Sequence, residues 1–289
     1  MKLPFTKMHG LGNDFILINC MESGDNCMDA TDLPALARRL CHRRLGIGAD
    51  QLLLLYPSHV AEFRMGIFNA DGSEVEMCGN GIRCLAKYIW DNGLSDKELI
   101  QVETPAGIIK PEKVNGFVRV DMGKPILDPE KIPLNIPPQP GVKNSKLIVD
   151  YPLQAGDREF RVTCISMGNP HAVIITDGLS AFPVAYYGPA IEHHPLFPKK
   201  TNVEFIEILN RSEIQMRVWE RGAGETMACG TGACAAAVAA HLMGLTEGNV
   251  TIHLGGGNLT INWDKDTHVY MTGPAVEVFT GAVDLNSLT

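Results

Sequence analysis

Residues 76–88 read EMCGNGIRCLAKY, and residues 226–238 read TMACGTGACAAAV. Each stretch contains Cys-Gly-x-Gly followed by a run suited to a helix, and the two leading cysteines, Cys78 and Cys229, are 151 residues apart. Gly12-Asn13 has a counterpart in Gly168-Asn169, at an offset of 156 residues. The strand and glycine turn at 102–107 resembles 250–256, at an offset of 149 for the glycines. Matches in the same order at similar offsets predict a duplicated half.

A proline-rich stretch at residues 125–140 lies between the two halves. Proline stops helices and inner strands, so this stretch predicts a stiff linker. We therefore expect two similar lobes that face each other across a cleft, which is a common place for a small-molecule site.

Short β-rich runs bounded by Gly, Asn, Asp and Pro predict strands along the whole chain. These runs are residues 15–19, 52–56, 63–68, 118–122, 172–175, 203–209, 214–219, 260–263 and 268–271. Helices are expected at 33–44 and after each Cys-Gly-x-Gly turn. In the first of these two, apolar residues recur at helical spacing and Asn92-Gly93 ends the helix. The second has almost no polar face up to Gly244, so we expect it to be buried inside its lobe.

The composition excludes several classes of protein. The chain has 289 residues, 45% hydrophobic and 20% charged, which is typical of a globular protein of two domains or one large one. A net charge of −8 without a dense basic run makes nucleic acid a poor partner. Apolar runs such as 52–56 are far shorter than the roughly 20 residues of a membrane helix, and no secretory or transit-like leader is apparent. We therefore expect a cytoplasmic protein.

Two of the eight cysteines lie where a thiol could take part in chemistry. No cysteine pair has the C-x-x-C spacing of zinc or redox sites, and most cysteines are expected to be small buried residues. Cys84 and Cys234 do not share a helix face with the leading cysteines, so they are expected in the core. Cys78 and Cys229 sit at predicted helix starts, where unpaired N–H groups and the helix dipole would lower a thiol pKa and hold a carboxylate.

Two such cysteines across a cleft admit three interpretations. An interlobe disulfide is disfavoured in the cytoplasm, and a metal site is weakly supported without a histidine pair. The third interpretation is an isomerase in which one thiolate removes a proton from a carbon and the opposite thiol returns one. Inversion of a stereocentre requires an acid-base group on each side of the carbon.

The sequence resembles the diaminopimelate epimerase family nearly end to end. The motifs that carry the resemblance are MHGLGNDF (8–15), GADQ (48–51), FNADGS (68–73), MCGNGIRC (77–84), MGNPH (167–171), TNV (201–203), ERGAGET (220–226) and CGTG (229–232). Residues 125–150 match least.

The resemblance implies an α+β fold of two pseudo-symmetric lobes, each a mixed β-sheet or barrel wrapped around a central helix, in a homodimer. We expect residues 1–122, completed by 275–289, to form the N-terminal lobe and residues 123–274 to form the C-terminal lobe. The activity implied is conversion of LL-2,6-diaminoheptanedioate to the meso form in lysine and peptidoglycan precursor biosynthesis, without pyridoxal phosphate, another cofactor or a metal.

The resemblance also implies the roles of individual residues. Cys78 and Cys229 would be the catalytic bases, and His171 and Glu220 would tune the thiols. The expected substrate-binding residues are Asn13, Gln51, Asn69, Gly79, Asn80, Asn169, Asn202, Glu220, Arg221, Gly230 and Thr231. From spacing alone, Asn13 and Asn169 could instead be turn residues, His171 a structural histidine, and Glu220-Arg221 an exposed charge pair.

Two other functions remain open at this point. A proline or hydroxyproline racemase would share the paired cysteines but would bind a ring without distal charges. A thiol redox sensor or a metal-binding module would use the same two cysteines without catalysing isomerisation.

Overall fold

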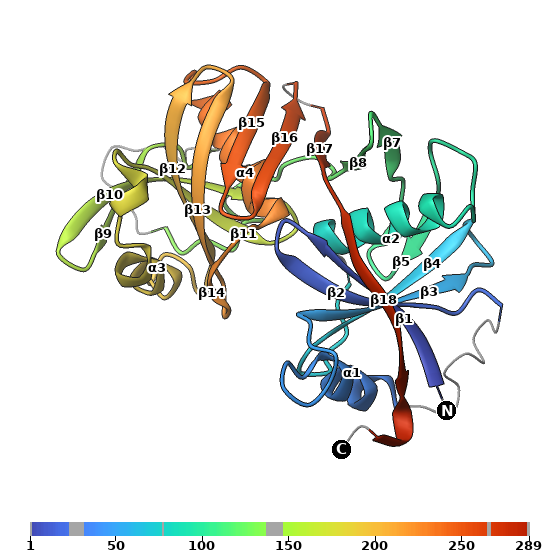
Figure 1. Cartoon of the computed structure of the whole chain (residues 1–289). Coiled ribbons are helices and arrows are strands. Elements are labelled where there is room, and N and C mark those ends of the chain that lie inside the picture. The colour runs from blue at the N-terminus through green and yellow to red at the C-terminus, as the bar shows by residue number, and fades with distance from the viewer. Residues whose placement is uncertain (1, 23–31, 77, 137–146, 265–266, 288–289) are drawn as a thin grey trace. The chain divides into compact units, whose positions relative to one another are not determined.

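The computed structural model describes residues 2–22, 32–76, 78–136, 147–264 and 267–287. The chain divides into two compact units (Figure 1). Unit 1 is Met1–Asp121 with Thr272–Thr289, and unit 2 is Met122–Met271. Within the described ranges, no helix has the length and hydropathy needed to cross a membrane.

Unit 1 contains a mixed seven-stranded sheet in the order β18-β1-β2-β3-β4-β5-β6. Its strands are β1 (Lys2–Gly10), β2 (Asn13–Asn19), β3 (Gln51–Pro57), β4 (Phe63–Asn69), β5 (Val102–Thr104), β6 (Gly107–Ile109) and β18 (Val276–Asp284). A short antiparallel hairpin follows, formed by β7 (Glu112–Val114) and β8 (Phe117–Asp121).

Unit 2 has its own mixed sheet, in the order β17-β16-β15-β13-β12-β11-β10-β9, with β14 paired to β13. Its strands are β9 (Tyr151–Ala155), β10 (Arg158–Ser166), β11 (Pro170–Ile175), β12 (Asn202–Asn210), β13 (Glu213–Glu220), β14 (Gly224–Thr226), β15 (Asn249–Leu254), β16 (Gly257–Trp263) and β17 (Val269–Gly273).

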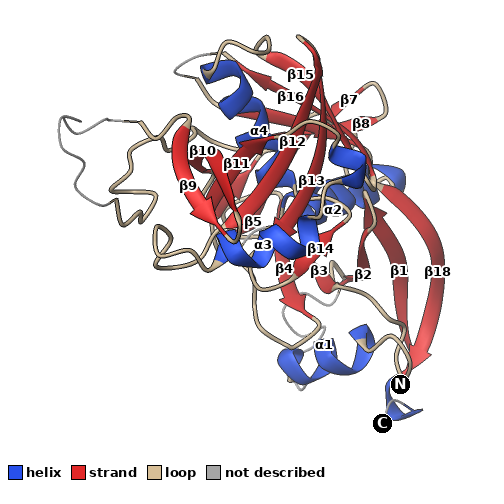
Figure 2. Ribbon diagram, turned by 90° about the vertical axis from the view of Figure 1, so that its left-hand side faces the viewer, coloured by secondary structure: helices blue, strands red, loops and turns tan. Residues whose placement is uncertain are grey.

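The two units have the same order of strand pairings. From β1 to β6 the successive pairs are antiparallel, parallel, antiparallel, parallel and antiparallel. The series β10-β11-β12-β13-β15-β16 repeats that order. Mixed sheets with few helices were predicted, and this is confirmed (Figure 2). Each predicted β run overlaps an observed strand.

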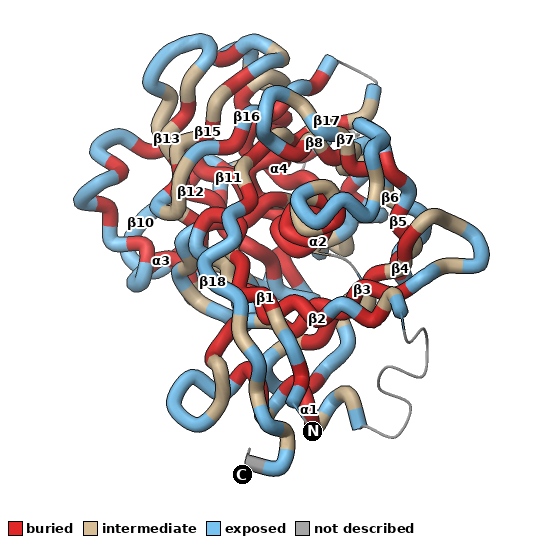
Figure 3. Tube along the Cα trace, turned by 45° about the vertical axis from the view of Figure 1, so that its right-hand side comes forward, coloured by how far each residue is buried: buried red, intermediate tan, exposed pale blue. Residues whose placement is uncertain are grey.

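A long helix begins at each Cys-Gly-x-Gly turn, as predicted: α2 (Gly79–Asp91) and α4 (Gly230–Leu242). Helix α2 packs against β1–β4, and α4 packs against β10–β13, β15 and β16. The apolar residues predicted to line α2 are all fully buried, and α4 is buried from Ala233 to Ala240. Figure 3 shows α2 as a buried helix, whereas the edge strand β18 is mostly exposed. Each central helix is therefore the core of its own unit.

Helix α1 (Leu33–Cys41) covers the other face of the unit 1 sheet and ends earlier than predicted. The prediction of a helix to residue 44 is wrong because the backbone of His42 is extended. The Leu40 carbonyl then accepts hydrogen bonds from the N–H groups of Ile47 and Gly48. With helices on both faces, Leu52 and Leu54 pack beside α1, while Leu53 contacts the side of α2, which explains the unbroken apolar run.

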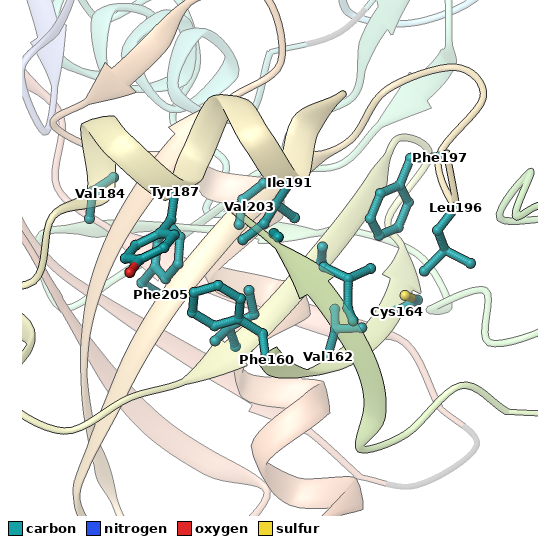
Figure 4. Close-up of a cluster of buried hydrophobic side chains, with 14 of the residues drawn as sticks. Phe160, Val162, Cys164, Val184, Tyr187, Ile191, Leu196, Phe197, Val203 and Phe205 are labelled. Atoms are coloured by element: carbon teal, nitrogen blue, oxygen red, sulfur yellow. The ribbon is translucent and has the colours of Figure 1, made fainter. Parts of the chain in front are cut away.

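Helix α3 (Val184–Glu192) covers the corresponding face in unit 2 and was not predicted. Figure 4 shows Val184, Tyr187 and Ile191 of α3 packed over Phe160 and other strand residues. Pro189 and Gly188 lie inside this helix, and both residues argue against a helix in the sequence. Gly188 is required because a Cβ there would lie 2.5 Å from Trp219.

The predicted stiff linker is partly wrong. The first part of the proline-rich stretch packs into unit 2: Ile126 forms a β-bridge with Ser166, and Ile132 is fully buried in the core. The Asn135 N–H donates to the Leu196 carbonyl at 2.9 Å. Pro137, Pro138 and residues 139–146 lie outside the described residues.

Candidate active site

In unit 1 the predicted site residues gather at one end of the sheet. Asn13 begins β2, Gln51 begins the parallel neighbour β3, and Asn69 ends β4, whose direction is opposite. Gln51 and Asn69 are directly paired across the strands, and Gln51 Nε2 donates to Asn69 Oδ1 at 2.8 Å. The buried Gln51 Oε1 has no hydrogen-bond partner within the described structure. It is therefore available to a donor group of a ligand.

Unit 2 repeats this placement. Asn169 immediately precedes β11, Asn202 begins the parallel strand β12, and Glu220 ends the antiparallel strand β13. Gly12 and Gly168 precede the two asparagines with φ of 87° and 94°, a left-handed conformation that favours glycine. The Gly-Asn repeat found in the sequence therefore marks the same structural position in the two units.

The cysteines of the two motifs are helix N-caps. Cys78 Sγ accepts from the Gly81 N–H at 3.4 Å, and Cys229 Sγ accepts from the Gly232 N–H at 3.4 Å. Both cysteines have extended backbones, with φ/ψ of −138°/116° and −128°/116°. Each sulfur therefore lies at the positive end of a helix, beside N–H groups that could hold an anion.

Asn13 and Asn80 complete the surroundings of the unit 1 thiol. Asn13 Oδ1 lies 3.7 Å from Cys78 Sγ, within the range of a sulfur hydrogen bond. The same oxygen accepts from Asn80 Nδ2 at 3.3 Å. The predicted residues Asn13, Cys78 and Asn80 therefore lie together, although Asn13 lies far from them in the sequence.

In unit 2 a buried chain of polar groups leads to the start of α4. The Glu204 carboxylate lies 2.7 Å from His171 Nδ1, and both side chains are fully buried. His171 Nε2 lies 2.9 Å from Asn169 Oδ1, and Asn169 Nδ2 donates to Thr231 Oγ1 at 3.3 Å. Thr231 Oγ1 is 3.5 Å from Cys229 Sγ. His171 thus reaches the turn that carries Cys229 through Asn169 and Thr231.

The expected lowering of the thiol pKa is wrong for Cys229. Burial raises the pKa of this thiol well above its usual value, and the carboxylates of Glu220 and Glu204 raise it further. Hydrogen bonds from Thr231 and the Gly232 N–H act in the opposite direction but are weaker. Helix N-termini lower a thiol pKa when water and positive charge are near, whereas this sulfur is dry and faces two acids.

Glu220 is a perturbed acid beside Cys229. Burial raises the pKa of Glu220, while side-chain hydrogen bonds with Thr226 and Cys229 oppose that shift. A carboxyl with a raised pKa next to a thiol is suited to exchange a proton with it. Glu220 is half-buried and hydrogen-bonds with Cys229, so an exposed charge pair of little consequence is ruled out for it.

Asn202 holds the backbone of Arg221. Asn202 Oδ1 accepts from the Arg221 N–H at 3.0 Å, and Asn202 Nδ2 donates to the Pro170 carbonyl at 3.0 Å. Arg221 Nη1 donates to the Lys199 carbonyl at 3.3 Å. The rest of the guanidinium keeps donors that could pair with a carboxylate.

Three residues next to the site were not singled out in the sequence: Asp50, Arg83 and Glu204. Arg83 and Glu204 are fully buried charges, a rare state that indicates a constrained role. Asp50 and Arg83 belong to the quoted motifs, and Glu204 stands in the apolar run of β12. A charged residue inside an otherwise buried strand was the available signal for Glu204.

The other cysteines are separated from this chemistry. Cys84 and Cys234 are fully buried, so their prediction as core residues is confirmed. Burial raises the pKa of Cys84 to about 12 and also raises the pKa of Cys41 and Cys164. Cys20 is buried in the core, as expected of most cysteines, and is disulfide-bonded. Among the described residues, no group of three or more His, Cys, Asp or Glu side chains could hold a metal ion.

Solved structures with the same fold include members of other families. A phenazine biosynthesis protein of the PhzF family from Bacillus anthracis has a TM-score of 0.69 at 16% identity, covering 99% of this chain and all of that one. A hydroxyproline epimerase from Agrobacterium vitis has a TM-score of 0.68 at 15% identity, covering 98% and 93% of the two chains. Such low identities establish the fold alone.

Comparison of sequences is more specific. The model of the diaminopimelate epimerase family matches residues 5–127 and 163–278. The diaminopimelate epimerase of Moorella thermoacetica is 56% identical over 98% of this chain and the whole of the relative. That of Acetivibrio thermocellus is 50% identical over 99% of this chain and the whole of the relative. The chain belongs to the diaminopimelate epimerase family.

Proposed function

We propose that this protein is a cofactor-independent two-base epimerase that converts LL-2,6-diaminoheptanedioate to the meso form in lysine and peptidoglycan precursor biosynthesis. One observation carries the proposal: two cysteines occupy equivalent helix N-caps in two units with the same strand topology. The proposal requires their sulfur atoms to meet opposite faces of one carbon when substrate binds. Family membership supports the choice of substrate.

The chemistry begins with removal of a proton from the carbon next to the reacting carboxylate. The C–H electron pair becomes an enediolate, and the negative charge accumulates on the carboxylate oxygens. The N–H groups at the starts of α2 and α4, from Gly79-Asn80 and Gly230-Thr231, are the proposed donors to those oxygens. Loss of one such donor costs about 10²–10³ in rate in other enzymes. The thiol on the other side then gives its proton to the carbon.

The thiol pKa sets the starting state at Cys229. Burial raises the pKa of the Cys229 thiol, which favours its protonated form, so Cys229 is the proposed proton donor and the opposite cysteine, Cys78, is the proposed base. After the proton is delivered, the Cys229 thiolate regains a proton from solvent or from Glu220, whose pKa is itself raised, and Cys78 releases the substrate proton to solvent. His171 holds Asn169 and so orients the groups around Thr231.

The remaining predicted residues would bind the distal end of the substrate. The free donors of Arg221 suit a carboxylate, and amide oxygens such as Gln51 Oε1 suit an ammonium. Asn69 and Asn202 stand beside these two groups and would position them. A substrate with a single amino-acid end would leave these groups unpaired, which predicts selectivity for the long substrate.

We also propose, from the family, a cytoplasmic homodimer.

Turnover in D₂O tests the two-base mechanism. We expect deuterium in the newly formed epimer, while the recovered substrate stays mostly protonated at early times. Equal early labelling of both would indicate a single exchanging base. Cys78→Ser and Cys229→Ser should each strongly depress epimerisation, because a hydroxyl is a far poorer base than a thiolate, whereas Cys84→Ala serves as the control. Near-normal activity of either serine variant, or racemisation of proline instead, would contradict the proposal.

A further inference from the structure

The Asn13 side chain lies between two groups that decide which way its amide points. Asp50 Oδ2 accepts from Asn13 Nδ2 at 2.9 Å and from the Asp14 N–H at 3.1 Å. An ionised carboxylate has no proton to donate, so it can pair only with the NH₂ end of the amide. The Asn13 carbonyl therefore has to point the other way, toward Cys78 and Asn80.

Arg83 fixes the orientation of the Asn80 amide, which in turn favours the same orientation of Asn13. Its guanidinium is fully buried and donates to Asn80 Oδ1 at 2.9 Å. It is anchored on the carbonyls of Gly79 and Pro274, both at 3.2 Å. Guanidinium has no acceptor, so Asn80 turns its NH₂ group toward Asn13 Oδ1, at 3.3 Å. A carboxylate, two amides and a guanidinium thus form one head-to-tail chain.

Asp50 is itself held by positive charge. Arg43 Nη2 lies 2.7 Å from Asp50 Oδ1 and 2.8 Å from Asp14 Oδ1, and Lys7 Nζ lies 2.6 Å from Asp14. Hydrogen bonds from Arg43 and Lys7 hold the pKa of Asp14 well below its usual range, although burial opposes this. Arg43 therefore holds the carboxylates of Asp14 and Asp50 together beside Asn13.

We propose that Asp50 and Arg83 are positioning residues, which fix the Asn13 amide with its carbonyl facing Cys78. The inference rests on the proposed role of Cys78 as an acid-base group. An acceptor facing the sulfur stabilises the thiol, whereas the NH₂ end would stabilise the thiolate. Orientation of this amide therefore sets the proton affinity of Cys78, and with it the driving force for taking the substrate proton.

The second unit differs at the same point. There the Asn169 carbonyl faces His171, and its NH₂ end faces Thr231 at the start of α4. The two equivalent asparagines therefore present opposite ends to the two helix starts. The clamp by Asp50 and Arg83 is thus specific to the Cys78 side.

Asp50→Asn tests the inference, because an amide at position 50 can pair with either end of Asn13. Asp91→Asn is the matched control. The Asp91 side chain is 42% exposed and pairs with Lys87 at 2.6 Å, and the Asp50 side chain is 43% exposed and pairs with Arg43 at 2.7 Å. The pH dependence of Cys78 alkylation by iodoacetamide, followed by peptide mass spectrometry, reports the thiol without needing substrate. Arg83 is unsuitable because its removal would leave buried groups unpaired.

We expect Asp50→Asn to lower the pH midpoint of alkylation, which makes Cys78 about 2- to 10-fold more reactive below that midpoint. Loss of the Asp50 charge would shift the midpoint in the same direction, so the substitution is repeated in an Asn13→Ala background. There the effect should fall below about twofold. An equal effect in both backgrounds, or no effect with Asn13 present, would overturn the inference. Absence of epimerisation by the unmodified protein would instead refute the proposed function.

Discussion

Gly81 and Gly232 are the third residues of α2 and α4, yet substitution by alanine should destabilise the protein strongly only at Gly232. A Cβ at Gly232 would lie 2.6 Å from Glu204 Oε1, 3.2 Å from Met216 and 3.3 Å from Cys229. A Cβ at Gly81 would lie 3.3 Å from Ile67 and Leu53. The contact with Glu204 at position 232 is too short to exist, so the carboxylate would have to move. The contacts at position 81 require shifts of only a few tenths of an ångström.

The expected difference in unfolding free energy follows from the displacement of Glu204. Alanine inside a helix gains about 0.5–1 kcal/mol over glycine. At Gly232 this is outweighed by overpacking, which costs about 1–3 kcal/mol, and by displacement of Glu204 from His171. That contact is 2.7 Å long and fully buried, and a hydrogen bond to a charged group contributes about 1.5–3 kcal/mol. Gly232→Ala should therefore lose roughly 2–5 kcal/mol, and Gly81→Ala should stay within about 1 kcal/mol of the unmodified protein.

Thermal unfolding followed by far-ultraviolet circular dichroism checks this pair. At about 2–4 °C per kcal/mol, Gly232→Ala should lower the Tm by roughly 5–15 °C, and Gly81→Ala should change it by a few degrees at most. Gly232→Ala should also reduce epimerisation, because Glu204 holds His171. Equal losses of stability at the two glycines would refute the reasoning, since the expected difference rests entirely on Glu204.

Three further predictions concern titration. Because the folded-state pKa of Asp14 is depressed, its contribution to stability is present above about pH 4 and is lost as the pH falls. Asp14→Asn should therefore lower the free energy of unfolding by about 1–3 kcal/mol at pH 7. In urea unfolding, the variant should also lose less stability than the unmodified protein as the pH is lowered. The pKa of Glu220 is raised in the folded protein, so its contribution to stability is present below about pH 4.5 and is lost as the pH rises through the folded-state pKa. Glu220→Gln should therefore become more stable relative to the unmodified protein as the pH rises from 4.5 to 7. A difference in unfolding free energy that stays constant over this range would contradict the shift. Cys84 is buried and has a pKa of about 12, so at pH 8 it should be labelled by iodoacetamide much less than the half-buried Cys78 in the folded protein. Equal labelling of the two cysteines in mass spectrometry would contradict the burial of Cys84.

The central helices could be predicted because several signals agreed there. In α2, apolar spacing, the glycine-rich start and Asn92-Gly93 at the end all indicate the same boundaries, and the N-caps are the predicted cysteines. Helix α3 could not be predicted because it contains Pro189 and because Gly188 is required by the packing of the helix on Trp219, so both residues lower its helix propensity. Strand β18 lacks an alternating pattern, because its residues are exposed or half-buried throughout.

The candidate site was predictable in its residue types but not in its contacts. Motifs brought out the two cysteines and the asparagines, and the strand ends explain why Asn13, Gln51 and Asn69 gather. Charge partners such as Glu204 depend on which face of β12 meets α4, and no short-range pattern carries that information. The thiol pKa was misjudged for the same reason: the helix dipole is local, whereas the dehydration of Cys229 is a property of the whole unit.

The pairing of β18 with β1 has a consequence for the order of folding. Synthesis runs from the N-terminus, so β1 leaves the ribosome long before its edge partner, which occupies residues 276–284. Unit 2 is continuous in the chain and can fold while the terminal segment is still being made. Unit 1 is completed last, with β1 exposing an open edge until residues 276–284 have been made and can pair with it. A released chain that stops after residue 271 would therefore contain all of unit 2 but would lack the edge strand of unit 1.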